Sequence, residues 1–274
     1  MKTITKIIVS LLILVITKVN AQDFQGVATY KSHRKVDLKM NDKNMNDEMQ
    51  KQIQEQLRKQ FQQEYTLTFN QNESIYKQNE KLDAPSPISS SGITIKISQG
   101  ADVMYKNVKE NRYTNKTETY GKLFLIKDTL SNRKWELVNE TKNIGDYTCF
   151  KAVYKDTYNT QTFTENGEAE EITKDRTTTV WYTPQIPVNN GPSDFYGLPG
   201  LILEVNEGDL TLVCTKIIIN PKETVAIVEP SKGKELSQTK YDEIMDKKSK
   251  EMMEQFRGRR GSGNGDRVMI RVGG

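Results

Sequence analysis

The chain of 274 residues carries 40 basic and 36 acidic side chains, and this net charge of +4 is too small to predict a nucleic-acid-binding surface. It contains one histidine, His33, and no Gly-x-Ser-x-Gly motif, which together exclude zinc sites built on several histidines and histidine-assisted serine hydrolysis. With 35% hydrophobic and 28% charged residues, the chain has the composition of a protein with a buried core.

The first 21 residues have the three parts of a secretory signal peptide. Lys2 and Lys6 give a positive start, Ile7–Ile16 is an apolar run, and the segment ending at Ala21 fits a signal-peptidase site. The apolar run is shorter than the roughly 20 residues that a transmembrane helix needs. We therefore predict export to the periplasm or the outer-membrane periphery, or beyond the cell, with no membrane-spanning segment after cleavage.

Cleavage before Gln22 changes the charge of the chain. It removes Lys2, Lys6 and Lys18, so 37 of the 40 basic residues remain against 36 acidic ones, a net charge of +1. Nucleic acid is therefore not an expected partner. The residue directly after the cleavage point is Gln22 and not a cysteine, so a lipid anchor is not expected either.

The start of the mature chain predicts a strand followed by a helix. Residues 24–31 alternate apolar and polar side chains, as in a half-buried strand. Apolar residues then recur every four positions from Met45 to Phe61, along one face of a helix expected over 42–63. The helix start resembles a calcium-binding loop, but Asp47 and Ile53 replace the glycine and glutamate that such a loop needs, so no metal site is predicted.

The rest of the body reads as a series of short strands. They are expected at 65–69, 74–77, 103–108, 112–119, 123–126, 135–140, 147–155, 177–182, 201–205, 210–219 and 224–228. Polar or Pro- and Ser-rich stretches at 84–92 and 159–174 read as loops. Short strands without intervening helices predict a mainly β (α+β) fold, a curved antiparallel sheet or half-barrel packed by the N-terminal helix.

The C-terminal end has a different composition. A helix with a thin apolar face is expected over 239–256, and 257–274 form an Arg/Gly-rich flexible tail. The predicted organisation is a signal peptide over 1–21, a β-rich domain over 22–230, a helical segment over 231–256 and the tail.

Cys149 and Cys214 lie in two of the predicted strands. In an exported protein they can form a disulfide, closing a loop worth about 4 kcal/mol in the chain-entropy model. The alternative is two buried free thiols, and the sequence leaves both readings open.

The most distinctive segment is 181–205. It combines a strand, a connection containing four prolines, and a second strand that begins with the apolar run Leu201, Ile202 and Leu203. Within it, Leu198-Pro199-Gly200-Leu201 suits a type II turn in which Gly200 takes a positive φ, and Gly197 allows close approach by another group.

This segment resembles the GLPGLI family of Gram-negative bacterial envelope proteins, whose motif stands here as residues 197–202. The resemblance extends to residues 144–152, which match the Ile-Gly-x-Tyr-x-Cys-x-Lys-Ala stretch of that family. It implies a protein of unknown function with no catalytic residues to transfer, often encoded near outer-membrane TonB-dependent receptors. The β-rich layout also resembles periplasmic lipoprotein carriers, which have a curved sheet over a helix.

Three hypotheses follow for the function. The first is a non-enzymatic binding or accessory protein that contacts an outer-membrane protein or an apolar ligand, without a cofactor. Its candidate binding residues are Asp194, Phe195, Tyr196, Gly197, Leu198, Pro199, Gly200, Leu201 and Ile202. The second is an envelope enzyme that uses carboxylate or hydroxyl groups near this loop, such as Asp194 and Glu204. The third is that the segment only closes the fold.

Overall fold

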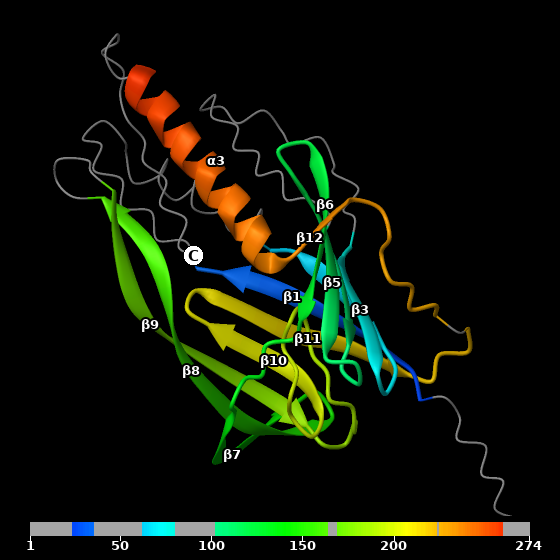
Figure 1. The fold of residues 1–274 in the computed structure, drawn as a ribbon. Helices are drawn as coiled ribbons and strands as arrows, with labels where there is room; N and C mark the ends of the chain where they lie inside the picture. The colour runs from blue at the N-terminus through cyan, green and yellow to red at the C-terminus, as the bar shows by residue number, and fades with distance from the viewer. Residues whose placement is uncertain (1–23, 36–61, 80–101, 164–168, 224, 260–274) are drawn as a thin grey trace, which may run out of the picture.

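The computed structural model describes residues 24–35, 62–79, 102–163, 169–223 and 225–259 (Figure 1). The signal peptide predicted over 1–21, residues 42–61 of the helix expected over 42–63, the loop predicted at 84–92 and the last fifteen residues of the predicted tail therefore lie outside the described residues. Gln62 and Gln63, the end of the expected helix, are described and are not helical.

Twelve strands form a single sheet in the order β12-β6-β5-β4-β3-β2-β1-β11-β10-β9-β8-β7. In chain order, the elements are β1 Gly26–Arg34, β2 Glu64–Phe69, β3 Glu73–Gln78, β4 Val103–Asn107, β5 Arg112–Thr119, β6 Lys122–Thr129, β7 Glu136–Ile144, β8 Tyr147–Phe163, β9 Ala169–Thr183, β10 Leu201–Glu207, β11 Leu210–Ile219, β12 Lys234–Leu236 and the helix α3 Gln238–Arg259.

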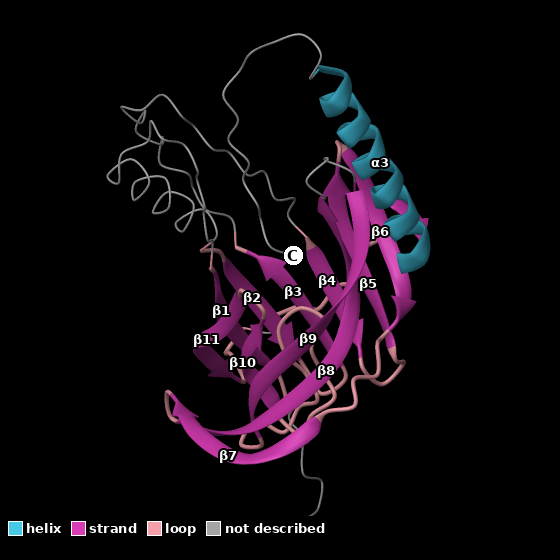
Figure 2. Cartoon of the chain, turned by 90° about the vertical axis from the view of Figure 1, so that its left-hand side faces the viewer, coloured by secondary structure: helices cyan, strands magenta, loops and turns pink. Residues whose placement is uncertain are grey.

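The sheet curves strongly but does not close into a barrel, and β7 and β12 are its two edges (Figures 1 and 2). Neighbouring strands are antiparallel, apart from β12, which runs parallel to β6. The prediction of a mainly β, curved antiparallel sheet is confirmed. The packing of an N-terminal helix against it falls on residues outside the described part of the chain.

Two local predictions are wrong. Most of the expected loop at 159–174 belongs to β8 and β9, whose pairing continues to Phe163 and Ala169. Polar side chains are tolerated there because a two-stranded ribbon beyond the core exposes both faces to water. The strand expected at 224–228 is not formed over 225–228; this stretch leads instead to β12.

The short strand β12, which follows residues 225–228, covers the outer edge of β6. β12 pairs with β6 from Phe124 to Ile126, which satisfies an edge that would otherwise present unpaired backbone groups. The helix α3 follows directly. Its Tyr241 ring packs edge-on against Phe124 with ring centroids 5.6 Å apart, and its hydroxyl lies 2.8 Å from the Thr119 hydroxyl. Within the described residues, no helix is both long enough and apolar enough to cross a membrane.

Buried apolar side chains form two clusters, and the connection between β9 and β10 contributes to both. The first cluster gathers residues such as Tyr30, Leu67 and Phe69. The second gathers residues such as Val180 and Tyr182. The connection and the start of β10 add Ile186, Val188 and Leu201 to the first cluster, and Phe195, Leu198 and Ile202 to the second. This segment therefore fills the interior of the curved sheet.

Cys149 and Cys214 are both buried and both free, so the disulfide reading is corrected. Their strands, β8 and β11, are separated in the sheet by β9 and β10. Both side chains join the first core cluster, but three strand spacings, about 14 Å along the curved sheet, lie between their backbones and the thiols are not bonded. Each thiol instead donates a weak hydrogen bond to a nearby carbonyl, that of Tyr147 for Cys149 and that of Lys216 for Cys214.

Candidate functional site

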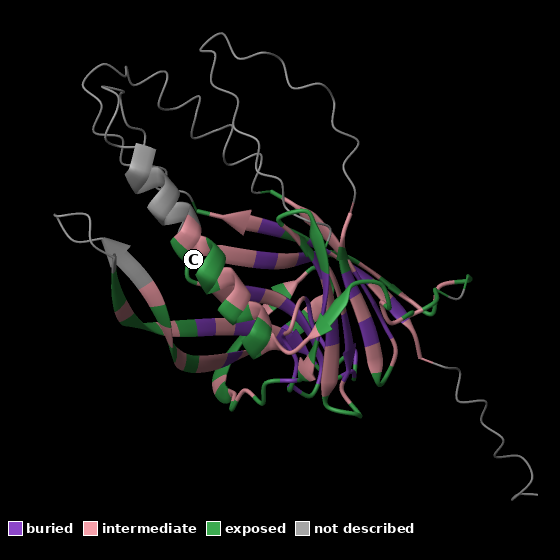
Figure 3. Cartoon of the chain, turned by 45° about the horizontal axis from the view of Figure 1, so that its top comes forward, coloured by how far each residue is buried: buried purple, intermediate pink, exposed green. Residues whose placement is uncertain are grey.

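A cleft of about 990 Å³ opens on the concave face of the sheet. Its walls come from strands on both sides of the curve and from Tyr241 of α3. Figure 3 shows buried residues (purple) alternating with half-buried ones (pink) along the central strands. The side chains that line the cleft are mostly polar, and its floor is formed by residues 193–195 of the β9–β10 connection.

Two residues directly opposite each other in the sheet hold this connection from below. Ser74 on β3 pairs with Lys106 on β4, so their side chains share one face. The Lys106 ammonium donates hydrogen bonds to the carbonyl oxygens of Gly191 (2.8 Å) and Phe195 (3.1 Å). The Ser74 hydroxyl donates to the Asn190 side-chain oxygen at 3.2 Å.

Lys106 is fully buried, with no exposed surface. Burial lowers the pKa of its amino group to about 7, because a charged ammonium loses its hydration; nearby Asp194 opposes this shift and Arg133 adds to it. A buried lysine of this kind is stable only where its donors are used, and here two backbone carbonyls take them. Lys106 therefore fixes the backbone on both sides of the cleft floor.

A second group of contacts orients the side chains of the floor. Arg133 donates to the Asp194 carbonyl oxygen at 2.9 Å and pairs with the Asp194 carboxylate. Its guanidinium also lies 4.7 Å from the centroid of the Phe195 ring, a cation–π contact. The indole N–H of Trp135 donates to the Tyr196 carbonyl oxygen at 2.8 Å. Asp194 and Phe195 thus have defined positions before any ligand arrives.

The wall beside the floor carries a second ion-pair network. Arg176 on β9 binds both carboxylate oxygens of Asp156 on β8, with its Nε 2.9 Å from one of them. Its guanidinium is also 3.6 Å from Glu207 on β10, which accepts a 2.6 Å hydrogen bond from the Thr178 hydroxyl. The hydrogen bond from Arg176 lowers the pKa of Asp156. Asp156 is therefore ionised at neutral pH, and both carboxylates are held by fixed partners.

The predicted binding residues divide between the core and the cleft. Leu198, Leu201 and Ile202 are buried in the core clusters. Phe195 and Tyr196 are also buried, whereas Gly197, Pro199 and part of Asp194 reach the surface. Of the nine residues 194–202, only Asp194 and Phe195 line the cleft.

The two glycines of the motif exchange the roles predicted for them. Gly197, not Gly200, has a positive φ, of 100°. Gly200 is the position of close approach, since a Cβ there would lie 2.2 Å from the carbonyl oxygen of Thr183. The expected type II turn is replaced by a tighter one, in which the Gly200 N–H donates to the Leu198 carbonyl oxygen at 2.8 Å.

The carboxylates proposed for an enzyme do not meet in one site. Asp194 binds Arg133 in the cleft, whereas Glu204 binds Lys142 at 2.7 Å and does not line the cleft. The single histidine, His33, is half-buried in β1 opposite Thr211. Among the described residues, no cluster of histidine, cysteine, aspartate and glutamate is arranged to hold a metal ion.

Sequence reasoning missed the residues that build the cleft. Lys106 had one signal, because it is a charged residue two positions after Met104 in a predicted strand and so shares the face of that apolar side chain. Arg133, Asp156, Arg176 and Glu207 had none, since each is an ordinary charged residue in a polar stretch. Only the fold brings them to one cleft.

Residues 135–204 match a family model described as a protein of unknown function (Porph_ging). The matched range contains both segments that carry the GLPGLI resemblance, and it includes Arg176, Asp194 and the whole β9–β10 connection.

No curated protein matches the chain. Two solved structures are similar to it, titled "Structure of PNGF-II in C2 space group" (TM-score 0.47, 16% identity) and "Structure of PNGF-II in P21 space group" (TM-score 0.46, 15% identity). Each comparison covers 80% of this chain and 32% of the other, so this chain spans about a third of the length of those proteins.

Proposed function

We propose that this protein is an exported, non-enzymatic binding protein of the GLPGLI type, which works in the periplasm or at the outer-membrane periphery. Its ligand enters the cleft on the concave face of the sheet. The observation that carries the proposal is the pre-organised floor: Lys106 and Arg133 fix the backbone and side chains of 193–195 through hydrogen bonds to Gly191, Asp194 and Phe195. Pre-organisation of this kind lowers the entropic cost of binding.

The lining of the cleft favours a polar ligand over the apolar one expected from the sequence. Ion-paired side chains such as Arg133, Asp156 and Arg176 stand in its walls. An apolar ligand would remove these groups from water without replacing the hydrogen bonds they make with it, at a cost of several kcal/mol. A ligand with its own donors and acceptors replaces those bonds.

The export half of the proposal rests on the N-terminal segment with Lys2, Lys6 and Ala21. An outer-membrane partner that docks on the GLPGLI motif would meet little of it, because Leu198, Leu201 and Ile202 are buried. The cleft is therefore the better candidate for the functional surface.

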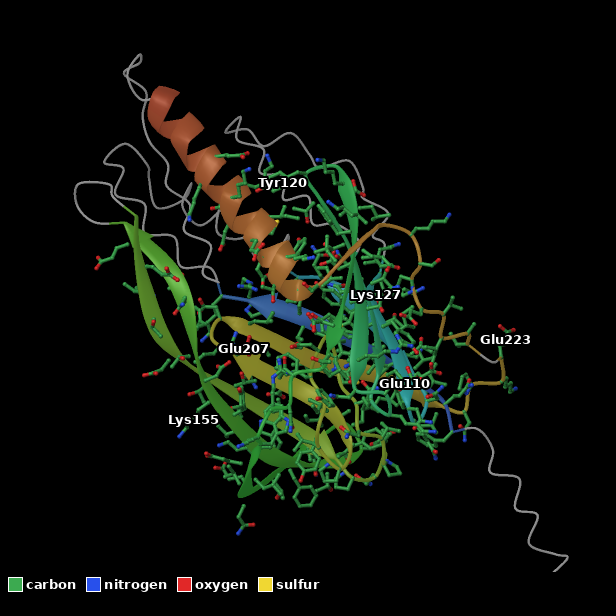
Figure 4. All side chains as sticks on the ribbon, in the orientation of Figure 1. Glu110, Tyr120, Lys127, Lys155, Glu207 and Glu223 are labelled. Atoms are coloured by element: carbon green, nitrogen blue, oxygen red, sulfur yellow. The ribbon has the colours of Figure 1, made fainter. Side chains whose placement is uncertain are left out.

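The test is native mass spectrometry of the full mature chain after incubation with an envelope extract and removal of unbound material. We expect a small-molecule adduct on the wild type and its loss in Ser131→Trp, which places an indole in the cleft. Lys155→Trp is the matched control, because Lys155 is exposed on β8 and points away from the body (Figure 4). An adduct that survives Ser131→Trp, or a wild type that carries none, contradicts the proposal.

A further inference from the structure

One end of the cleft is a group of hydrogen-bond acceptors beside aromatic rings. Met104 on β4 lies opposite Tyr76 on β3 and Asn115 on β5. Asp102 precedes Met104 by two residues and so points to the same face, where the Thr117 hydroxyl hydrogen-bonds to its carboxylate. We call Tyr65, Tyr76, Asp102, Asn115 and Glu118, all of which line the cleft, the acceptor end.

At this end, one amide oxygen lacks a hydrogen-bond donor and two carboxylates lack an ion-pair partner among the residues that the structure describes. The side-chain oxygen of Asn115 is buried and receives no hydrogen bond. Neither Asp102 nor Glu118 forms an ion pair with any described residue. A buried acceptor without a donor costs about 1–3 kcal/mol, which a ligand donor would recover.

The cleft as a whole also carries a net negative charge. Arg34, Arg133 and Arg176 face five lining carboxylates, those of Asp102, Glu118, Asp156, Asp194 and Glu207, which leaves a net charge of −2. Arg133 and Arg176 are already bound to carboxylates near the floor. Near the floor these two arginines meet three carboxylates, and at the acceptor end Arg34 meets Asp102 and Glu118, so each part of the cleft carries a net charge of −1. Partial burial of Asp102 raises the pKa of its carboxyl, although the Thr117 hydrogen bond opposes this.

Aromatic faces complete the acceptor end. The rings of Tyr65 and Tyr76 are stacked, with centroids 5.0 Å apart and planes inclined by 8°. Tyr120 and Tyr241 border the same cleft. Tyrosine faces attract cations, and guanidinium groups also stack on them.

We infer that the acceptor end binds the cationic group of the ligand, an alkylammonium or guanidinium, with Asp102 as its counter-ion, Asn115 as a hydrogen-bond acceptor and the tyrosine rings as its stacking surface. This inference rests on the proposed function and names the chemical class of its ligand. A basic peptide segment or a polyamine presents such a group. An anion is disfavoured by the charge of the cleft.

The test is calorimetric titration of the full mature chain with two tripeptides, acetyl-Gly-Arg-Gly-amide and its citrulline counterpart, which has the same shape without the charge. We expect the arginine peptide to bind at least about tenfold more tightly. Asp102→Asn should remove this preference. Glu223→Gln removes the same charge from the segment after β11, away from Tyr120 and Glu207 (Figure 4), and should leave the preference unchanged.

Equal affinity for the two peptides, or an arginine preference that survives Asp102→Asn, would overturn the inference. Asn115→Leu is a second test, because it removes the unpartnered oxygen without changing the charge. It should lower the affinity for the arginine peptide severalfold. A neutral or anionic ligand whose adduct is lost in Ser131→Trp would sink the cationic class and leave the proposed function standing. If no ligand binds in a way that depends on the cleft, both the inference and the proposed function are wrong.

Discussion

The ammonium of Lys106 donates a 2.8 Å hydrogen bond to the carbonyl oxygen of Gly191, which lies 85 residues further along the chain. The bond joins the end of β4 to the connection that fills the curved sheet. The same ammonium also reaches the Phe195 carbonyl oxygen, so one buried charge organises the floor of the cleft.

Replacing Lys106 with methionine should destabilise the protein by about 2 kcal/mol, because two buried carbonyl oxygens lose their donor while the cost of burying a charge disappears. Urea unfolding followed by tryptophan fluorescence measures this. Lys127→Met is the control, since Lys127 forms an exposed pair with Glu235 and its loss should cost less than about 1 kcal/mol. A Lys106→Met variant as stable as the wild type would contradict the assigned role.

The same residue predicts a pH dependence. Burial lowers the pKa of Lys106 from 10.5 to about 7 in the folded protein, so between these values the unfolded chain holds a proton that the folded chain lacks. Stability relative to Lys106→Met should therefore rise with pH above 7, by at most about 1.4 kcal/mol per unit, and fall as pH drops towards 7.

Urea midpoints of both proteins between pH 7 and about 8.5 test this slope. The range stays below the region where cysteines interfere: burial raises the pKa of Cys149 to about 11 and of Cys214 to about 12, so both thiols ionise first in the unfolded chain and oppose the trend above pH 9. If the urea midpoints of the two proteins change with pH in parallel, burial does not lower the pKa of Lys106.

Gly200→Ala should destabilise the protein by more than about 2 kcal/mol, because the added Cβ would meet the Thr183 carbonyl oxygen at 2.2 Å and backbone atoms must move. Pro199→Ala, one residue earlier and exposed, should cost less than about 1 kcal/mol. Thermal unfolding of the two variants measures both losses of stability. Equal losses of stability would show that the close approach of Gly200 to Thr183 is not what makes this motif sensitive to substitution.

Both cysteines should react as free thiols once the protein is unfolded. We expect two thiols per chain to react with a disulfide reagent in denaturant without reductant, and almost none in the folded protein, because both are buried and burial raises their pKa. Prior treatment with reductant should not change the count. Thiols that appear only after reduction would restore the disulfide reading.

Local residue patterns determined where most strands lie. The expected strands over 112–119 and 210–219 have the bounds of β5 and β11, because alternation of side chains follows from the pleat of the strand itself. The helix expected over 239–256 corresponds to α3 for the same reason, its apolar residues recurring with the period of the helix. A regular series of such strands also determined the mainly β class.

The tertiary structure alone decided which residues meet. The order of the strands separates Cys149 from Cys214, places β12 parallel to β6, and sets Ser74 opposite Lys106 under the β9–β10 connection. The physical reason is that these contacts join segments far apart in the chain, so no local pattern specifies them. The sequence by itself determined most of the strands and the motif, and it predicts an export signal, whereas the cleft, its charge and its fixed floor exist only because the sheet curves around that motif.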